Sequence, residues 1–137
     1  MATVNQLAET FAVLKPDQGI DLVDVSPELY ASLDADYDNF KDHSLVACHH
    51  FNDDWPSWER HPAGDEVVVL LSGTVTLVVR TSEGDQSHTL FEQSDYVVVP
   101  RNTWHTAKIT EPTTLLFITP GQGTEHVDAL PDAPHNP

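Results

Sequence analysis

The spacing of apolar residues changes near residue 43. Before that point four apolar residues recur at close to helical spacing, Val4, Leu7, Phe11 and Leu14. This spacing predicts a short helix over residues 4–14. A second helix is expected to begin at Ser26-Pro27, because proline is tolerated in the first turn and serine can accept free backbone N–H groups. We expect it to end in the acidic stretch that starts at Asp34.

From residue 43 onward the chain consists of short runs rich in β-branched and aromatic residues, interrupted by turn residues about every 8 to 12 positions. The predicted strands cover residues 44–51, 57–61, 66–71, 74–81, 88–92, 96–99, 105–110 and 113–119. Turn-forming residues separate several of them, at Ser72-Gly73, Glu83-Gly84-Asp85 and Arg101-Asn102. The pattern predicts an all-β fold in which the strands close into a barrel.

Two predicted strands are nearly continuous in apolar residues, at 67–71 and 97–99. Such strands are typically buried on both faces, one toward the barrel lumen and one against helices or a partner subunit. This favours a homodimer. Because residues 121–137 are rich in Gly, Pro and polar residues, we expect a loose C-terminal tail there. The chain is therefore divided into an N-terminal helical extension that packs on the barrel (1–42), the barrel (43–120) and the tail (121–137).

The length and the charge of the chain exclude several classes of function. A chain of 137 residues suits one domain. Six basic residues against 22 acidic ones give a formal net charge of -16, which would repel nucleic acid and anionic membranes. No apolar run reaches the roughly 18 residues that a membrane helix requires. The N-terminus lacks the basic start and apolar run of a secretory signal, so we expect a cytoplasmic protein.

The segment around residue 60 contains the residues best suited to bind a metal or to catalyse a reaction. Glu59 and His61 are two positions apart on a predicted strand and therefore project from one face. The turn-forming residues 62–65 would reverse the chain and place Glu66 beside His61 on the neighbouring strand. His105 follows another turn and could reach the same point across a closed barrel.

A further pair of histidines is ambiguous. His49 and His50 are adjacent on one predicted strand, so one must face the lumen and the other must face away. The alternation of a strand does not say which of them faces inward.

Three positions match the first motif of the cupin superfamily, G-x5-H-x-H-x3,4-E-x6-G. His61 stands at the second His, Glu66 at the Glu and Gly73 at the closing Gly. Glu59 occupies the place of the first metal-binding His. The chain therefore resembles the cupins with a ligand set of two Glu and two His in place of three His and one Glu.

The second cupin motif, G-x5-P-x-G-x2-H-x3-N, is matched in part. Pro100 and His105 hold their places, while three positions depart from the motif, at Ser94, Asn102 and Ile109. The change at Asn102 is mild, because Asn tolerates a left-handed turn position better than other non-Gly residues. The resemblance covers about residues 43–119.

The resemblance implies a cupin double-stranded β-helix, or jelly-roll barrel, with short N-terminal helical segments. It also implies a divalent-metal site formed by Glu59, His61, Glu66 and His105. Two carboxylates and two neutral imidazoles suit manganese, iron or zinc, and they cancel the charge of the ion. Such a site favours oxygen or enediolate chemistry over simple hydrolysis. We expect an enzyme of the dioxygenase or isomerase type that acts on a small, oxygen-rich organic molecule.

Other functions fit the same residues. Without a metal, repulsion between the two carboxylates would raise the pKa of one of them and give an acid–base pair, as in epimerase- or dehydratase-like cupins. A non-catalytic module that binds or senses a metabolite or a metal would use the same pocket. Glu59 could also point outward, paired with Arg60 or another surface group, while His61 and His105 only fill the barrel mouth. The fold does not choose among these.

Overall fold

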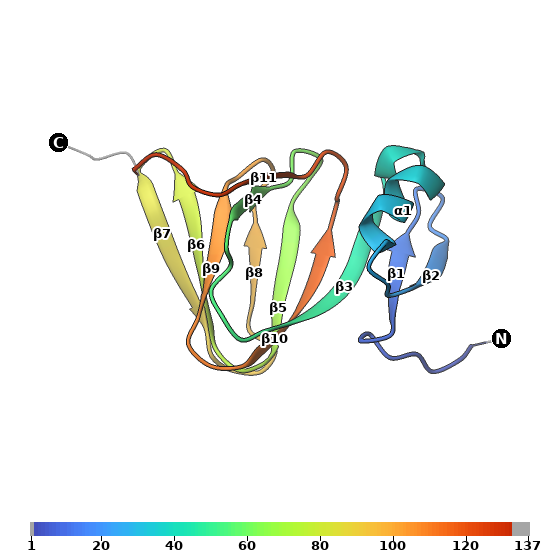
Figure 1. Ribbon diagram of the computed structural model, residues 1–137, viewed down its shortest axis with the longest axis horizontal. Helices are drawn as coiled ribbons and strands as arrows, with labels where there is room; N and C mark the ends of the chain where they lie inside the picture. The colour runs from blue at the N-terminus through green and yellow to red at the C-terminus, as the bar shows by residue number, and fades with distance from the viewer. Residues whose placement is uncertain (1, 133–137) are drawn as a thin grey trace.

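The strands of this protein bury every second side chain. Strands β5 (Glu66–Ser72), β6 (Val75–Thr81) and β10 (Thr113–Thr119) each begin with an alternation of buried and half-buried residues. This alternation is that of sheets with one face on a core. The computed structural model describes residues 2–132, and its strands form two antiparallel sheets that face each other (Figure 1).

One sheet has six strands in the order β2-β1-β3-β10-β5-β8, and the other has five in the order β11-β4-β9-β6-β7. The remaining strands are β1 (Thr10–Leu14), β2 (Ile20–Asp24), β3 (Ser44–Phe51), β4 (Trp58–Arg60), β7 (Gly84–Leu90), β8 (Tyr96–Val99), β9 (His105–Ile109) and β11 (Glu125–Val127). The all-β prediction is confirmed, since the helices α1 (Leu29–Asp36) and η1 (Asp38–Phe40) are short.

The main core lies between the two sheets. Val68 of β5 and Leu115 of β10 meet Leu77 of β6 and Ala107 of β9, and all four are fully buried. A second cluster joins α1 and the first strand to the inner face of β3, and it contains Phe11, Val13, Leu29, Leu33, Phe40, Leu45 and Ala47. The N-terminal segment is therefore packed against the end of the six-stranded sheet.

The structure corrects the helix predicted over residues 4–14. Strand β1 ends at Leu14 and pairs with both β2 and β3. Phe11 and Val13, two positions apart, have exposures of only 1% and 0%, while Val4 is almost fully exposed. The two-residue period of the buried pair decides the local structure. The second predicted helix is confirmed as α1, which ends in the acidic stretch, but no side chain caps its N-terminus.

The C-terminal tail also differs from its prediction. Strand β11 pairs with β4, where Glu125 lies opposite Arg60 and forms an ion pair with it at 2.8 Å. Residues 125–127 are therefore part of the five-stranded sheet, and the last part of the predicted tail, residues 133–137, lies outside the described residues. At the β8–β9 connection Asn102 has a φ of 57°, in agreement with the left-handed turn position expected for it.

The turn at Ser72-Gly73 connects the two sheets and does not form a hairpin, because β5 and β6 belong to different sheets. Gly73 has a φ of +90°, and a Cβ atom there would lie 2.4 Å from the carbonyl oxygen of Pro112. Glycine is therefore required at this crossing. Among residues 2–132 there is no helix that is both long and apolar enough to cross a membrane.

Residues 2–132 of one chain do not bury both faces of the apolar strands. The outward-facing residues Tyr96 and Val98 of β8 remain 63% and 49% exposed. α1 packs on the opposite, inner side of the six-stranded sheet, through Leu29 and Leu33.

Candidate metal centre

All four predicted site residues lie together at one end of the space between the sheets. Glu59 is on β4, His61 follows that strand, Glu66 begins β5 and His105 begins β9. Glu59 and His105 are direct partners across the β4–β9 pair. One ligand atom from each of the four residues lies within 4.8 Å of the others, so the cluster could hold a metal ion.

The nitrogen and oxygen atoms converge at short distances. His105 Nε2 lies 3.1 Å from Glu66 Oε1 and 3.3 Å from Glu59 Oε1. His61 Nε2 lies 3.1 Å from Glu66 Oε2 and 3.4 Å from Glu59 Oε1. Although it is buried, His61 Nε2 has no hydrogen bond of acceptable geometry with the described residues. His61 Nε2 therefore faces the point between the two carboxylates and does not bond to a single acceptor.

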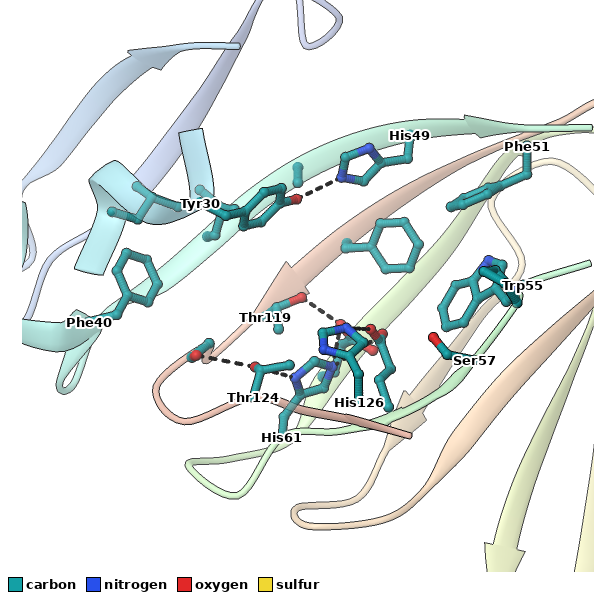
Figure 2. A pocket seen from close by; sticks show the side chains of 18 of the residues that line it. Tyr30, Phe40, His49, Phe51, Trp55, Ser57, His61, Thr119, Thr124 and His126 are labelled. Carbon is teal, nitrogen blue, oxygen red and sulfur yellow. Dashed lines mark hydrogen bonds and ion pairs between the residues drawn. The ribbon is translucent and has the colours of Figure 1, made fainter. Parts of the chain in front are cut away.

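The second nitrogen of each imidazole fixes its tautomer. His105 Nδ1–H donates a hydrogen bond of 2.9 Å to the carbonyl oxygen of Thr103. The hydroxyl of Thr124 donates to the carbonyl of Gly121, so its oxygen accepts from His61 Nδ1–H at 2.9 Å (Figure 2). Both rings therefore direct Nε2 toward the carboxylates, as histidine ligands of metals do.

The carboxylates are also held by neighbours. The hydroxyl of Thr119 donates to Glu66 Oε2 at 2.5 Å, and His126 of β11 lies 3.2 Å from Glu59 Oε2 (Figure 2). Sequence reasoning did not identify Thr119, Thr124 or His126. His126 could be placed at the centre only by predicting that residues 125–127 pair with β4. The sequence did not predict this pairing, because the polar tail has no strand pattern.

The centre is electrostatically balanced without a metal. Burial lowers the pKa values of the two imidazoles, but hydrogen bonds and charges from Glu59 and Glu66 outweigh it. They raise the pKa of His61 to about 9 and that of His105 to about 10. Burial raises the pKa values of the two carboxyl groups, but the two histidines reverse this and hold both pKa values below their ordinary value. The prediction that the pKa of one carboxylate is raised is wrong, because hydrogen bonds and positive charge from both imidazoles favour the ionised carboxylates.

Glu59 does not point outward. Its side chain is only 19% exposed and contacts both histidines of the centre. Arg60 instead pairs with Glu125 and lies over the Trp104 ring at 4.5 Å. The alternative in which Glu59 pairs with Arg60 at the surface is therefore wrong.

A cavity of about 450 Å³ opens from the centre toward the N-terminal segment. His49 lines this cavity, whereas His50 is exposed and lies 2.9 Å from the Thr114 hydroxyl. The ambiguity of the histidine pair is thus resolved in favour of His49. Most of the surface that lines the cavity is apolar.

The family model described as Cupin domain matches residues 52–119, which contain all four residues of the centre. The protein belongs to the cupin superfamily. A comparison with curated proteins found no match.

Several solved structures are similar to part of this cupin. A cupin-2 domain containing protein from Shewanella frigidimarina has 22% identity and a TM-score of 0.48 over 56% of this chain and 70% of that chain. A cupin superfamily protein from Desulfitobacterium hafniense has 23% identity and a TM-score of 0.48 over 56% and 65%. Hydroquinone 1,2-dioxygenase from a Sphingomonas species has 14% identity and a TM-score of 0.47 over 56% and 58%. This cupin therefore spans just under two thirds of the second structure and a smaller share of the third.

Proposed function

We propose that this cupin is a metal-dependent enzyme that acts on a small, oxygen-bearing organic molecule, with Glu59, His61, Glu66 and His105 as the metal ligands. The observation that carries the proposal is the orientation of the two imidazoles. Each ring uses Nδ1–H on an oxygen of the protein and turns Nε2 toward both carboxylates. The fully buried position of His105 and the convergence of four ligand atoms within 4.8 Å support a cation at this point.

Manganese, iron or zinc suits this set of oxygen and nitrogen ligands, and such an ion would polarise an oxygen atom of the substrate, with redox chemistry available to iron and manganese. The residues of the chain would orient the substrate and exclude water through the apolar cavity wall. His126 lies beside Glu59 and is half-exposed, so its ring can exchange a proton with solvent. These features support a reaction of the dioxygenase or isomerase type.

The metal content of untagged protein, measured by mass spectrometry, tests the proposal. We expect about one ion per chain after an apo sample is refilled with iron, manganese or zinc. His105→Ala should lose the ion, whereas His88→Ala, a change in an exposed residue of β7, should retain it. Equal metal content in the two variants, or no ion in any wild-type sample, would contradict the ligand assignment.

A binding or sensing module without turnover is the second candidate. The cavity could hold a ligand without converting it, and ligand would then stabilise the protein against heat in proportion to RT ln(1 + [L]/Kd). Product formation that depends on the metal would exclude this candidate. Stabilisation without product, over a panel of diketones, catechols and hydroxy acids, would favour it.

We further propose a homodimer formed through the outer face of the six-stranded sheet. The strand registers place ten uncharged residues side by side there, Ala12, Leu22, Val46, Cys48, Val67, Val69, Tyr96, Val98, Leu116 and Ile118. The absence of charge among them contrasts with the 22 acidic residues of the chain. Six strands about 4.8 Å apart make this face about 24 Å wide, so the uncharged residues form one contiguous surface. Asp24 of β2 shares this face at its edge, and a second copy would cover the uncharged part with twofold symmetry.

Light scattering during size-exclusion chromatography tests the dimer. We expect a mass twice the 15.2 kDa of one chain. Val98→Asp should give a monomer because it places a charge in the interface. Phe91→Asp, a matched change in an exposed residue outside the outer face, should leave the dimer intact. A monomeric wild-type protein would overturn the proposal.

We also propose a cytoplasmic location for this cupin. Fractionation of cells that express the untagged chain tests it, and recovery of the protein outside the cytoplasmic fraction would contradict it.

A further inference from the structure

The body of the cavity next to the metal centre is aromatic. Phe51, Trp55 and Phe117 contact one another, with ring centroids 5.7 to 6.2 Å apart. Trp55 also lies against the ring of His105, with the centroids 6.1 Å apart. A ligand that extends away from the centre therefore passes along a wall of flat rings.

The N-terminal segment supplies the opposite side of the cavity. Tyr30 and Leu33 come from α1 and Phe40 comes from η1, and all three line the cavity (Figure 2). The Tyr30 hydroxyl lies 2.7 Å from His49 Nε2, and the two rings stack at an interplanar angle of 24°. Since Tyr30 is 54% exposed, this pair forms the mouth of the cavity and not part of the core.

The protonation of this pair near neutral pH follows from its position. Burial, with the charges of Glu59 and Glu66, raises the pKa of Tyr30 to about 12. Burial lowers the pKa of His49, despite the opposing charge of Glu59. The phenol therefore stays protonated and donates to a neutral imidazole, so the mouth presents two uncharged rings to the ligand.

The charge of the metal centre restricts the charge of the ligand. Two carboxylates and a divalent ion cancel formally, whereas one carboxylate with three histidines would leave a positive charge. Asp34 and Asp54 also line the cavity, and the whole chain carries a net charge of -16. A small dianion gains little attraction here, while a neutral or singly charged molecule meets little repulsion.

The volume of the cavity sets the scale of the ligand. About 450 Å³ falls within the range of roughly 300 to 1,000 Å³ that is typical of small-molecule sites. An apolar cavity of about 150 Å³ is enough to hold benzene. The space thus accommodates a substituted ring or two fused rings in addition to the groups that reach the metal.

Resting on the metal centre of the proposed function, we infer that the substrate is a flat, conjugated molecule with an oxygen-bearing end, and that the N-terminal segment forms one side of its binding site. The oxygen-bearing end faces Glu59, His61, Glu66 and His105. The ring system lies between the aromatic wall and the Tyr30–His49 pair. The N-terminal segment is therefore part of the binding site and selects for the flat body of the ligand.

Equilibrium dialysis of zinc-loaded protein against two probes tests this inference. 4-Nitrocatechol carries oxygen atoms on a flat ring. Oxalate carries oxygen atoms without a ring and has two negative charges. We expect 4-nitrocatechol to bind at least about tenfold more tightly than oxalate, and only to the zinc-loaded form. Tyr30→Ala should weaken 4-nitrocatechol about tenfold through lost ring contacts and leave oxalate within twofold. Phe91→Ala, a matched loss of an exposed aromatic ring outside both the cavity and the outer face, should change neither probe.

A second variant tests the cavity independently, in case Tyr30→Ala changes the local structure. Ala47→Leu adds three carbons to a buried side chain of the cavity wall and should also weaken 4-nitrocatechol while zinc content stays the same. Equal affinities for the two probes, or 4-nitrocatechol binding unchanged in both cavity variants, would overturn the substrate class while leaving the metal centre in place. A wild-type protein without zinc would instead overturn the proposed function itself.

Discussion

Zinc binding to the apo protein should release about two protons near neutral pH. The pKa values of His61 and His105 are raised to about 9 and about 10, so both imidazoles are charged in the apo protein at neutral pH. A metal-ligating imidazole must be neutral, so the ion displaces both protons. Glu59 and Glu66 contribute none, because their lowered pKa values leave them already ionised.

The size of the effect follows from the two pKa values. A pH of about 7.5 lies about 1.5 below the first pKa and about 2.5 below the second, and each pKa unit corresponds to about 1.4 kcal/mol. Proton competition therefore opposes binding by about 5 kcal/mol, or about four orders of magnitude in affinity. The apparent affinity should rise by about two logarithmic units per pH unit between about pH 7 and pH 8.5 and should level off above about pH 10.

Calorimetric titration of zinc into apo protein, in buffers that differ in ionisation enthalpy, measures the number of protons directly. His88→Gln is the control and should still release about two, whereas His105→Gln should release about one and bind more weakly. Release of less than one proton by the wild-type protein would refute the reasoning, since it would mean that the imidazoles are neutral in the apo centre.

Four further predictions follow from the same structure. Thr124→Ala removes the acceptor of His61 Nδ1–H and should weaken zinc binding about 10- to 100-fold in a competition titration, whereas Thr124→Ser should retain most of the affinity. Glu59→His restores the common cupin ligand set and should retain or tighten metal binding, and an unchanged affinity and metal preference in a metal titration would argue that Glu59 is not a ligand. The folded pKa values of the two imidazoles are raised, so their stabilisation is complete below about pH 6.5 and is lost as pH rises through about 9 to 10. The apo Tm from differential scanning fluorimetry should fall over that window, and a flat profile would argue against the raised values. Gly73→Ala should lower the free energy of unfolding in urea by more than about 1 kcal/mol, because its Cβ would clash with backbone at a positive φ.

Much of the barrel could be predicted because its strands carry strong local patterns. β3, β8 and β10 have the predicted bounds, each supported by a run of β-branched or aromatic residues between turn signals. The error at residues 4–14 arose because apolar positions spaced by three and four residues also contain a pair spaced by two. Phe11 and Val13 form that pair, and packing against β3 decides between the two periods.

The ligands of the centre were within reach of sequence reasoning, but their supporting groups were not. Glu59, His61 and Glu66 are close along the chain, and the turn between β4 and β5 brings them together, although these strands lie in the two facing sheets and are not paired as expected. Thr124 and His126 reach the centre only through the pairing of β11 with β4, which joins positions more than 60 residues apart. The cavity mouth depends in the same way on the docking of α1 beside β3.

The distance in sequence between the parts of the centre has a consequence for the order of biosynthesis. The hydrogen bonds that orient Glu66 and His61 come from Thr119 and Thr124, which are 53 and 63 residues further along the chain. A ribosome-bound chain that has exposed β4 and β5 would hold three of the four ligands but neither of these hydroxyls. Contacts of such separation form late, because the entropy of closing the intervening loop must be lost first. Metal capture is therefore expected to complete folding after synthesis has passed residue 124, and a nascent chain halted before that residue should retain little zinc.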